Sequence, residues 1–157
     1  MYIFTINAKD YDEKSINKSE LQQLINKHKS YVRHMTRNKR YYEGNHAIRT
    51  RQKKLKGSSN NKIVCNHAKD ISDTATGYFM SSPISYSAHE DKNKEAVSRL
   101  TDAFDKAETD RTDSDNAHDM SVCGVAYEYI YAKKDKAELS IRNLEAENTF
   151  LVYDYTI

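Results

Sequence analysis

Residues 60–84 read NNKIVCNHAKDISDTATGYFMSSPI, and this stretch decides how the rest of the fold is interpreted. Its apolar side chains recur every three or four residues, the spacing that gathers them on one face of an α-helix. They are Ile63 or Val64, Ala68, Ile71, Ala75, Tyr78 and Phe79. The spacing therefore predicts an amphipathic helix over residues 61–80 that buries this face, with Pro83 in the turn that closes it.

Helices are predicted on both sides of this central one. A capping box that starts at Ser19 predicts a first helix with a possible break near Ser30, and Gly44 is its expected terminator. Residues 45–59 are then expected to form a basic loop. Two later helices are predicted over residues 91–108 and 112–123, the second with Ala117, Met120 and Cys123 inward and Gly124 just past its end.

Alternating residues and β-branched residues predict short strands in the second half of the chain. The predicted strands span residues 84–88, 125–132, 137–144 and 149–153. The middle two form a hairpin around residues 133–136. Together these elements predict an α+β fold, with amino-terminal helices, a central amphipathic helix, a helix pair and a small antiparallel sheet. Residues 1–17 are interpreted as an amino-terminal arm and residues 18–157 as the domain.

The charge of the chain is unevenly distributed, although the net charge of its 157 residues is only +2. Residues 27–56 hold eleven Lys or Arg against one acid, whereas residues 57–157 hold eleven against eighteen. A basic block on an acidic body favours a polyanion or an acidic neighbouring subunit as a partner. A solvated helical face is the alternative interpretation.

The cysteines and the hydropathy indicate a reduced, intracellular setting. Cys65 and Cys123 belong to no closely spaced pair, so neither a disulfide framework nor a zinc motif is predicted. Both are interpreted as small buried residues. No apolar run approaches the roughly 20 residues of a membrane span, so no membrane partner is expected.

Catalytic and metal-binding motifs are not apparent. The acidic residues 110–119 lack the glycine and the ligand spacing of a calcium loop, and an acid-rich first helical turn explains them better. Cys65 and His67 point to different sides of a helix, which argues against zinc. With 4 glycines and no phosphate loop, dinucleotide fingerprint or serine elbow, the chain is interpreted as a non-enzyme without catalytic residues, metal or cofactor.

The basic block is the remaining candidate site. Its candidates for contact with nucleic acid or with a subunit are Arg33, Arg37, Lys39, Arg40, Arg49, Arg51, Lys53, Lys54 and Lys56. Clustered cations bind phosphates through counterion release, and interleaved tyrosines stack on single-stranded bases. The favoured alternative is that these cations meet acids of a neighbouring subunit, because the rest of the chain supplies such acids.

Several motifs, in order along residues 18–155, resemble the portal proteins of tailed phages that infect Gram-positive bacteria. Residues 41–48 resemble that family's Tyr-Tyr-x-Gly-x-His-x-Ile opening, and residues 61–79 its Asn-Lys-Ile-Val-x-Asn helix that ends in Thr-x-x-Gly-Tyr-Phe. Residues 124–128 are similar to its Gly-x-Ala-Tyr-Glu strand. The matching positions are Tyr41, Tyr42, Gly44, His46, Asn61, Asn66, Asp73, Thr74, Gly77, Tyr78, Phe79, Pro83, Gly124 and Tyr127.

The resemblance implies a structural subunit of a ring, usually of twelve copies, at one capsid vertex of the virion. Such rings pass double-stranded DNA during packaging and ejection, and they meet terminase, capsid and scaffolding proteins and the head–tail adaptor. Assembly in the bacterial host cytoplasm is implied as well. The chain is expected to correspond to the amino-terminal wing of a longer phage or prophage subunit. The alternative function is a small nucleic-acid-binding protein that uses residues 27–56.

Overall fold

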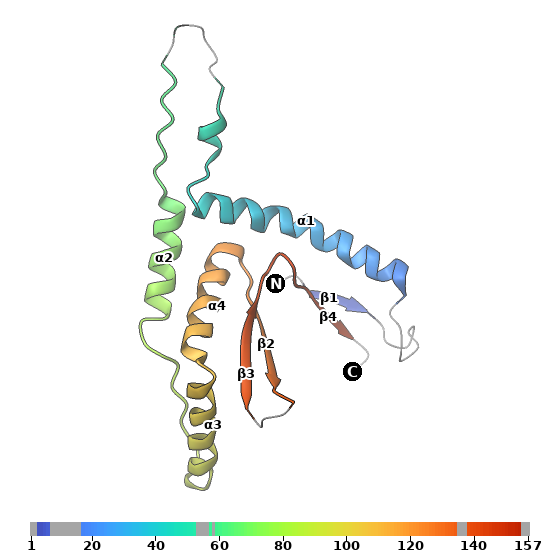
Figure 1. The fold of residues 1–157 in the computed structure, drawn as a ribbon, viewed down its shortest axis with the longest axis vertical. Helices are drawn as coiled ribbons and strands as arrows, with labels where there is room; N and C mark the ends of the chain where they lie inside the picture. Colours follow the sequence, from blue (N-terminus) through green and yellow to red (C-terminus); the bar gives the residue numbers. More distant parts are fainter. Residues whose placement is uncertain (1–2, 7–16, 53–56, 58, 135–137, 155–157) are drawn as a thin grey trace.

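The computed structural model describes residues 3–6, 17–52, 57, 59–134 and 138–154. Its helices are α1 (Lys18–Tyr42), α2 (His67–Phe79), α3 (Lys94–Lys106) and α4 (Thr109–Cys123), with short 3-10 turns η2 (Ala47–Thr50) and η3 (Asp91–Asn93). Its strands are β1 (Ile3–Ile6), β2 (Tyr127–Ala132), β3 (Leu139–Leu144) and β4 (Leu151–Asp154). Figure 1 shows α1 lying across one end of α4 and of the β2–β3 hairpin. The predicted α+β class is confirmed.

The strands form two separate pairs within the described residues. β2 and β3 make the predicted antiparallel hairpin, in which Tyr127 lies opposite Leu144. β1 pairs in parallel with β4, from Ile3 beside Leu151 to Ile6 beside Asp154, a pairing that the sequence analysis missed. The predicted strand at residues 84–88 was wrong. No strand pairs with this segment among the described residues, and hydrogen-bonded partners are what make an extended segment a sheet strand.

The first helix is continuous, so the predicted break near Ser30 was wrong. The Ser30 hydroxyl donates to the carbonyl of Lys27 at 2.7 Å, a local bond that the helix accommodates. The predicted cap was also misplaced by two residues. The capping residue is Asn17 and not Ser19. The side-chain oxygen of Asn17 accepts a hydrogen bond from the backbone N–H of Ser19 at 3.1 Å.

The other helix boundaries differ from the predictions mainly at the amino-terminal ends. α2 begins at His67 rather than near residue 61, because the side chain of Asn66 caps it by accepting the N–H of Lys69 at 3.3 Å. Gly44 and Gly124 follow α1 and α4 with φ of 75° and 79°, the left-handed conformation that glycine adopts at low cost, so both predicted terminators are confirmed.

The core lies where α1 crosses α4 and the hairpin. Its buried residues are Met35, Val122, Cys123, Val125, Tyr127 and Ala146. Tyr31, Tyr42 and Leu144 pack against this cluster. A second contact carries Phe4 of β1 against Phe150 in an edge-to-face arrangement, with ring centroids 5.4 Å apart. The ring of Phe4 also lies 6.3 Å from that of Tyr31, centroid to centroid, so β1 contacts both α1 and the segment just before β4.

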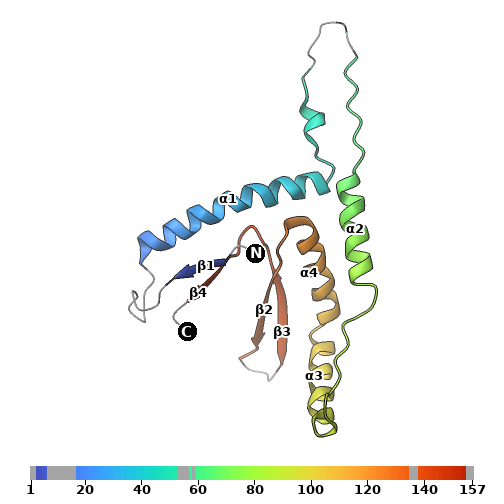
Figure 2. The same cartoon turned by 180° about the vertical axis from the view of Figure 1, so that it is seen from behind.

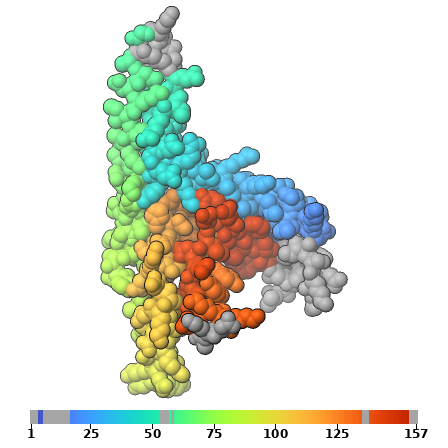
Figure 3. Space-filling model, in the orientation of Figure 1, coloured from blue at the N-terminus to red at the C-terminus, as the bar shows by residue number. Residues whose placement is uncertain are grey.

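Between α1 and α2 the chain leaves the body as two runs, residues 45–52 and 59–66, which are together called the arm (Figures 1 and 2). Arg51 links its two runs by donating to the side chain of Asn60 at 3.3 Å and to the carbonyl of Asn61 at 3.2 Å. Lys62 donates to the carbonyl of Arg49 at 2.8 Å. Figure 3 shows the arm projecting from one end of the elongated molecule.

The burial of α2 contradicts the prediction for its apolar face. Ile71 is 69% exposed, Tyr78 87% and Phe79 73%, so the helix turns most of this face to solvent. Met120 of α4 was expected to face inward and is 57% exposed beside them. The physical reason is that α2 packs on α1 and α4 through a different, more polar edge, at which Ser72 is buried.

Candidate functional site

Several of the family-motif residues meet at the corner where α1 ends and α2 begins. Asn66 holds this corner, because its amide group donates to the carbonyl of Tyr42 at 2.8 Å while its side-chain oxygen caps α2. Gly44 lies directly against it. A Cβ added at Gly44 would come within 3.3 Å of the Asn66 side-chain nitrogen, so a larger residue would crowd the bond to Tyr42.

His46 closes the same corner from the arm side. Its ring stacks on the ring of Tyr41 with centroids 4.8 Å apart, and its Nε2 lies 3.0 Å from the Tyr41 carbonyl and 3.3 Å from the Asn66 side-chain oxygen. Both neighbours are acceptors, so Nε2 is the nitrogen that carries the proton. The contacts fix the direction in which the arm leaves the body.

A polar cluster links α1 to α2 one turn further along. The Tyr42 hydroxyl donates to Asp73 at 2.8 Å and accepts from Lys69 at 3.0 Å, and Lys69 pairs with Asp73 at 3.0 Å. The hydrogen bonds from Lys69 and then Tyr42 lower the pKa of Asp73, while those to Tyr42 and Asp73 raise the pKa of Lys69. The ring of Tyr42 also meets His118 of α4 edge-on at 4.8 Å.

Sequence reasoning found Tyr42 and Asp73 but not Lys69 or His118. The spacing of Lys69 and Asp73, four residues apart on a helix, was a readable signal for an ion pair. His118 gave no such signal, because its contact depends on how α4 lies against α1.

The remaining motif residues do not join this corner. Gly124 ends α4, and Tyr127 is buried in the core. Asn61 lies in the arm, where its carbonyl accepts from Arg51. The other motif residues outside the corner, all of them exposed, are Thr74, Gly77, Tyr78, Phe79 and Pro83.

The basic candidates are divided between two faces of α1. Arg33, Arg37 and Arg40 recur at helical spacing and are all exposed. Lys39 instead points to the body and forms an ion pair with Glu147. Partial burial is the largest single influence on Lys39 and opposes its charge. The hydrogen bond to Glu147 and the nearby Cys123, Glu147 and Asp119 together outweigh it, so the pKa of Lys39 is raised.

The arm holds the other basic candidates. Arg49 and Arg51 are exposed, although Arg51 already bridges the two runs of the arm. Lys53, Lys54 and Lys56 lie outside the described residues. The exposed basic candidates among the described residues therefore form a row of three on α1 and a pair in the arm.

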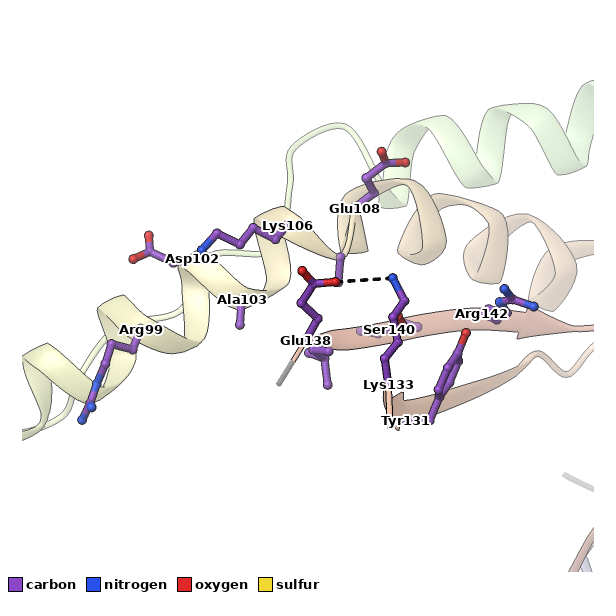
Figure 4. Close-up of a pocket in the computed structure, with 13 residues that line it drawn as sticks. Arg99, Asp102, Ala103, Lys106, Glu108, Tyr131, Lys133, Glu138, Ser140 and Arg142 are labelled. Atoms are coloured by element: carbon purple, nitrogen blue, oxygen red, sulfur yellow. Dashed lines mark ion pairs between the residues drawn. The ribbon is translucent and has the colours of Figure 1, made fainter. Parts of the chain in front are cut away.

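A polar crevice of about 730 Å³ lies between α3 and β3 (Figure 4). Arg99, Asp102 and Lys106 of α3 line one side of it. Lys133 and Glu138, which pair at 3.6 Å, line the hairpin side. The crevice is half open, and its charged side chains lie apart along two elements rather than converging on one point (Figure 4). This arrangement does not resemble a nucleophile with an adjacent base.

The cysteines differ from each other more than the sequence indicated. Cys123 is buried, as predicted, and burial raises the pKa of its thiol to about 11. Cys65 is exposed, so its predicted burial was wrong; it lies in the extended run that leads into α2. Among the described residues, no group of three or more His, Cys, Asp or Glu side chains is placed to hold a metal ion.

A comparison of the sequence with known protein families shows which family it matches. Residues 21–157 match the family described as phage portal protein, SPP1 Gp6-like. The chain belongs to this portal family. The match includes the corner, α2 and the hairpin, and confirms the resemblance inferred from the motifs.

Membership places the protein among the structural, head–tail connector proteins of phages, a family that is not enzymatic. A search of curated proteins found no match. Among the described residues, no helix is long and apolar enough to cross a membrane.

Proposed function

We propose that this portal protein is a subunit of a closed ring at one capsid vertex, through which double-stranded DNA is packaged and ejected. The observation that supports this proposal is the family match over residues 21–157. The body supports a role in assembly, because it combines a small core with a large exposed apolar face and separated charges. Twelve copies are the expected ring size.

Capsid and scaffolding proteins, terminase and the head–tail adaptor are the partners proposed for the ring in the virion. The charged crevice between α3 and β3 offers polar contacts for such proteins, and the exposed row on α1 offers cations. Assembly is proposed to take place in the host cytoplasm.

Light scattering and electron microscopy of the purified chain test the ring. We expect a mass of about a dozen times 18.2 kDa and closed rings with a central hole, at moderate salt and high protein concentration. A particle that stays at 18.2 kDa under every condition would contradict ring formation by this chain.

The alternative function, binding of nucleic acid, is favoured by one specific observation. Arg33, Arg37 and Arg40 form an exposed row on α1, and a row of cations neutralises phosphates without reading sequence. The test is binding of a DNA duplex at several salt concentrations. We expect Ala at all three positions to weaken binding and flatten its salt dependence if this function holds.

The matched control replaces Lys92 and Lys94, exposed cations near the start of α3. These form local ion pairs with Glu90 and Asp91, so they should contribute little to a phosphate contact. Equal loss of binding in both variants would indicate general attraction rather than a site on α1.

A further inference from the structure

The face of α2 that carries its large apolar residues is mostly exposed. Ile71, Tyr78 and Phe79 turn to solvent, and Met120 of α4 extends the same surface. We name these four residues the apolar stripe. Contiguous exposed apolar surface of this kind marks an interaction site far more often than scattered exposed residues do.

The rotation of α2 that exposes the stripe is fixed by polar contacts on its other side. Lys69 and Asp73 bind the Tyr42 hydroxyl, and Ser72 is buried against the neighbouring helices. Thr76 adds a side-chain oxygen that is buried without a partner among the described residues. The body thus buries small polar groups of α2 in preference to its large apolar ones, which leaves the stripe for another surface.

The stripe lines two hollows beside α2 and α4 that share Ser121, and these two hollows are together called the groove. One hollow of about 470 Å³ is lined by Arg37, Ile71 and Ser121, among others. A second, of about 430 Å³, continues from Ser121 to Met120 and Phe79. Both hollows open to solvent, and α2 forms one edge of the molecule in both ribbon views (Figures 1 and 2).

The charges of α1 and of the α3–α4 segment indicate what covers the groove. α1 carries seven Lys or Arg against one acid, and its exposed Arg37 lies at one end of the groove. The segment of α3 and α4, residues 94–123, carries eight acids against four Lys or Arg. Unlike charges on different elements of one chain favour contact between unlike faces of two copies, the geometry that closes rings.

We infer that the groove is filled by a second copy of this chain, which brings its α3–α4 segment against the apolar stripe and its acids toward Arg37. This inference rests on the proposed ring and assigns one side of its subunit contact. Burial of the stripe supplies the attraction, and the charges select the orientation of the incoming copy.

The first test compares two aspartate substitutions of equally exposed apolar residues. Phe79→Asp lies in the groove, whereas Ile63→Asp lies in the arm, at 73% and 72% exposure respectively. We expect Phe79→Asp to weaken self-association at least about a hundredfold, the effect of removing a central interface residue, and Ile63→Asp to leave it unchanged. Light scattering gives the mass, and circular dichroism checks that both variants fold.

The second test asks what the stripe touches. A photoreactive phenylalanine analogue is placed at position 78 of the otherwise intact chain, where the side chain is 87% exposed. We expect cross-links to a peptide from residues 94–123 of another copy, identified by mass spectrometry of mixed isotope-labelled chains. Rising salt should weaken association, because the charge contact is screened.

The outcomes separate this inference from the proposed ring. If Phe79→Asp assembles like the unmodified chain, or if the cross-links go elsewhere, the inference is overturned and the ring stands. If the unmodified chain remains at 18.2 kDa throughout, ring formation by this chain fails and the inference fails with it.

Discussion

Helices α1 and α2 both carry apolar residues at helical spacing, yet only α1 buries them. Leu24, His28 and Met35 of α1 lie under the helix, against the body. α2 turns Ile71 and Phe79 outward and buries Ser72 instead. The comparison teaches that amphipathic periodicity predicts a helix and a face to be covered, but not whether the same chain provides the cover.

The difference follows from the surroundings of the two helices. α1 crosses α4 and the hairpin, so one whole side of it meets apolar side chains such as Val122 and Tyr127. α2 lies at the edge of the molecule and is held by polar bonds at its first turns. Four predictions test this contrast.

Truncation of a core residue of α1 should have the largest effect. Met35 is 2% exposed, so Met35→Ala removes buried contacts and leaves a cavity, at an expected cost of about 2–5 kcal/mol in the free energy of unfolding. Ile71→Ala on α2 should change it by less than about 0.5 kcal/mol, because that side chain is largely in solvent. Urea unfolding at a protein concentration where the chain is monomeric measures both. Similar losses in the two variants would break the comparison.

The existence of α1, α3, α4 and the hairpin was predictable, because each depends on local patterns. Gly44 and Gly124 are examples, since their position after a periodic run signals a helix end. The pairing of β1 with β4 was not predictable, because Ile3 and Leu151 are far apart in sequence and a four-residue strand has little pattern of its own. The orientation of α2 was missed for a related reason: it depends on Tyr42, a residue of another helix.

The candidate site was predictable in its membership and not in its geometry. The motif residues Tyr42, Gly44 and Asn66 were singled out by resemblance, but only the fold reveals that they meet at one corner. The basic candidates were grouped by composition. The fold divides them, because Lys39 turns toward Glu147 while Arg37 stays in solvent.

Loss of Asn66, the corner residue that joins the two helices, should have the second-largest effect on stability. Asn66→Ala removes the cap of α2 and the bond to the Tyr42 carbonyl, and we expect it to cost about 1–2 kcal/mol in thermal or urea unfolding. Asn93→Ala is the matched control, because Asn93 precedes α3 without a side-chain capping bond. An equal cost at both positions would mean that the corner contributes nothing specific.

The two cysteines report on the two regions separately. At pH 8 a thiol reagent should modify Cys65 beside α2 at once, and Cys123 beneath α1 only on unfolding.

Because the folded pKa of Cys123 is about 11 against 9.0 for a free thiol, the unfolded chain loses this proton first, and stability should fall between pH 9 and 11. Cys123→Ala should reduce that fall by about 1 kcal/mol, well under the roughly 2.7 kcal/mol of an unscreened two-unit shift. An unchanged pH profile in this variant would contradict the assigned burial.

The smallest effect is expected from the ion pairs, and it too should differ between the helices. Lys39 of α1 and Glu147 are both largely covered, whereas Lys69 and Asp73 on α2 are about half exposed. Lys39→Met should therefore cost about 0.5–1 kcal/mol at pH 7, and Lys69→Met should cost less, because water and salt screen the outer pair. The raised pKa of Lys39 means that its contribution is complete below pH 10.5 and disappears as the pH rises through the folded value.

A double-mutant cycle with Glu147→Gln isolates the pair from the loss of the lysine stem. The coupling energy of Lys39 with Glu147 should exceed that of Lys69 with Asp73. If it does not, burial beneath α1 does not strengthen the ion pair, and the two helices differ only in their apolar faces.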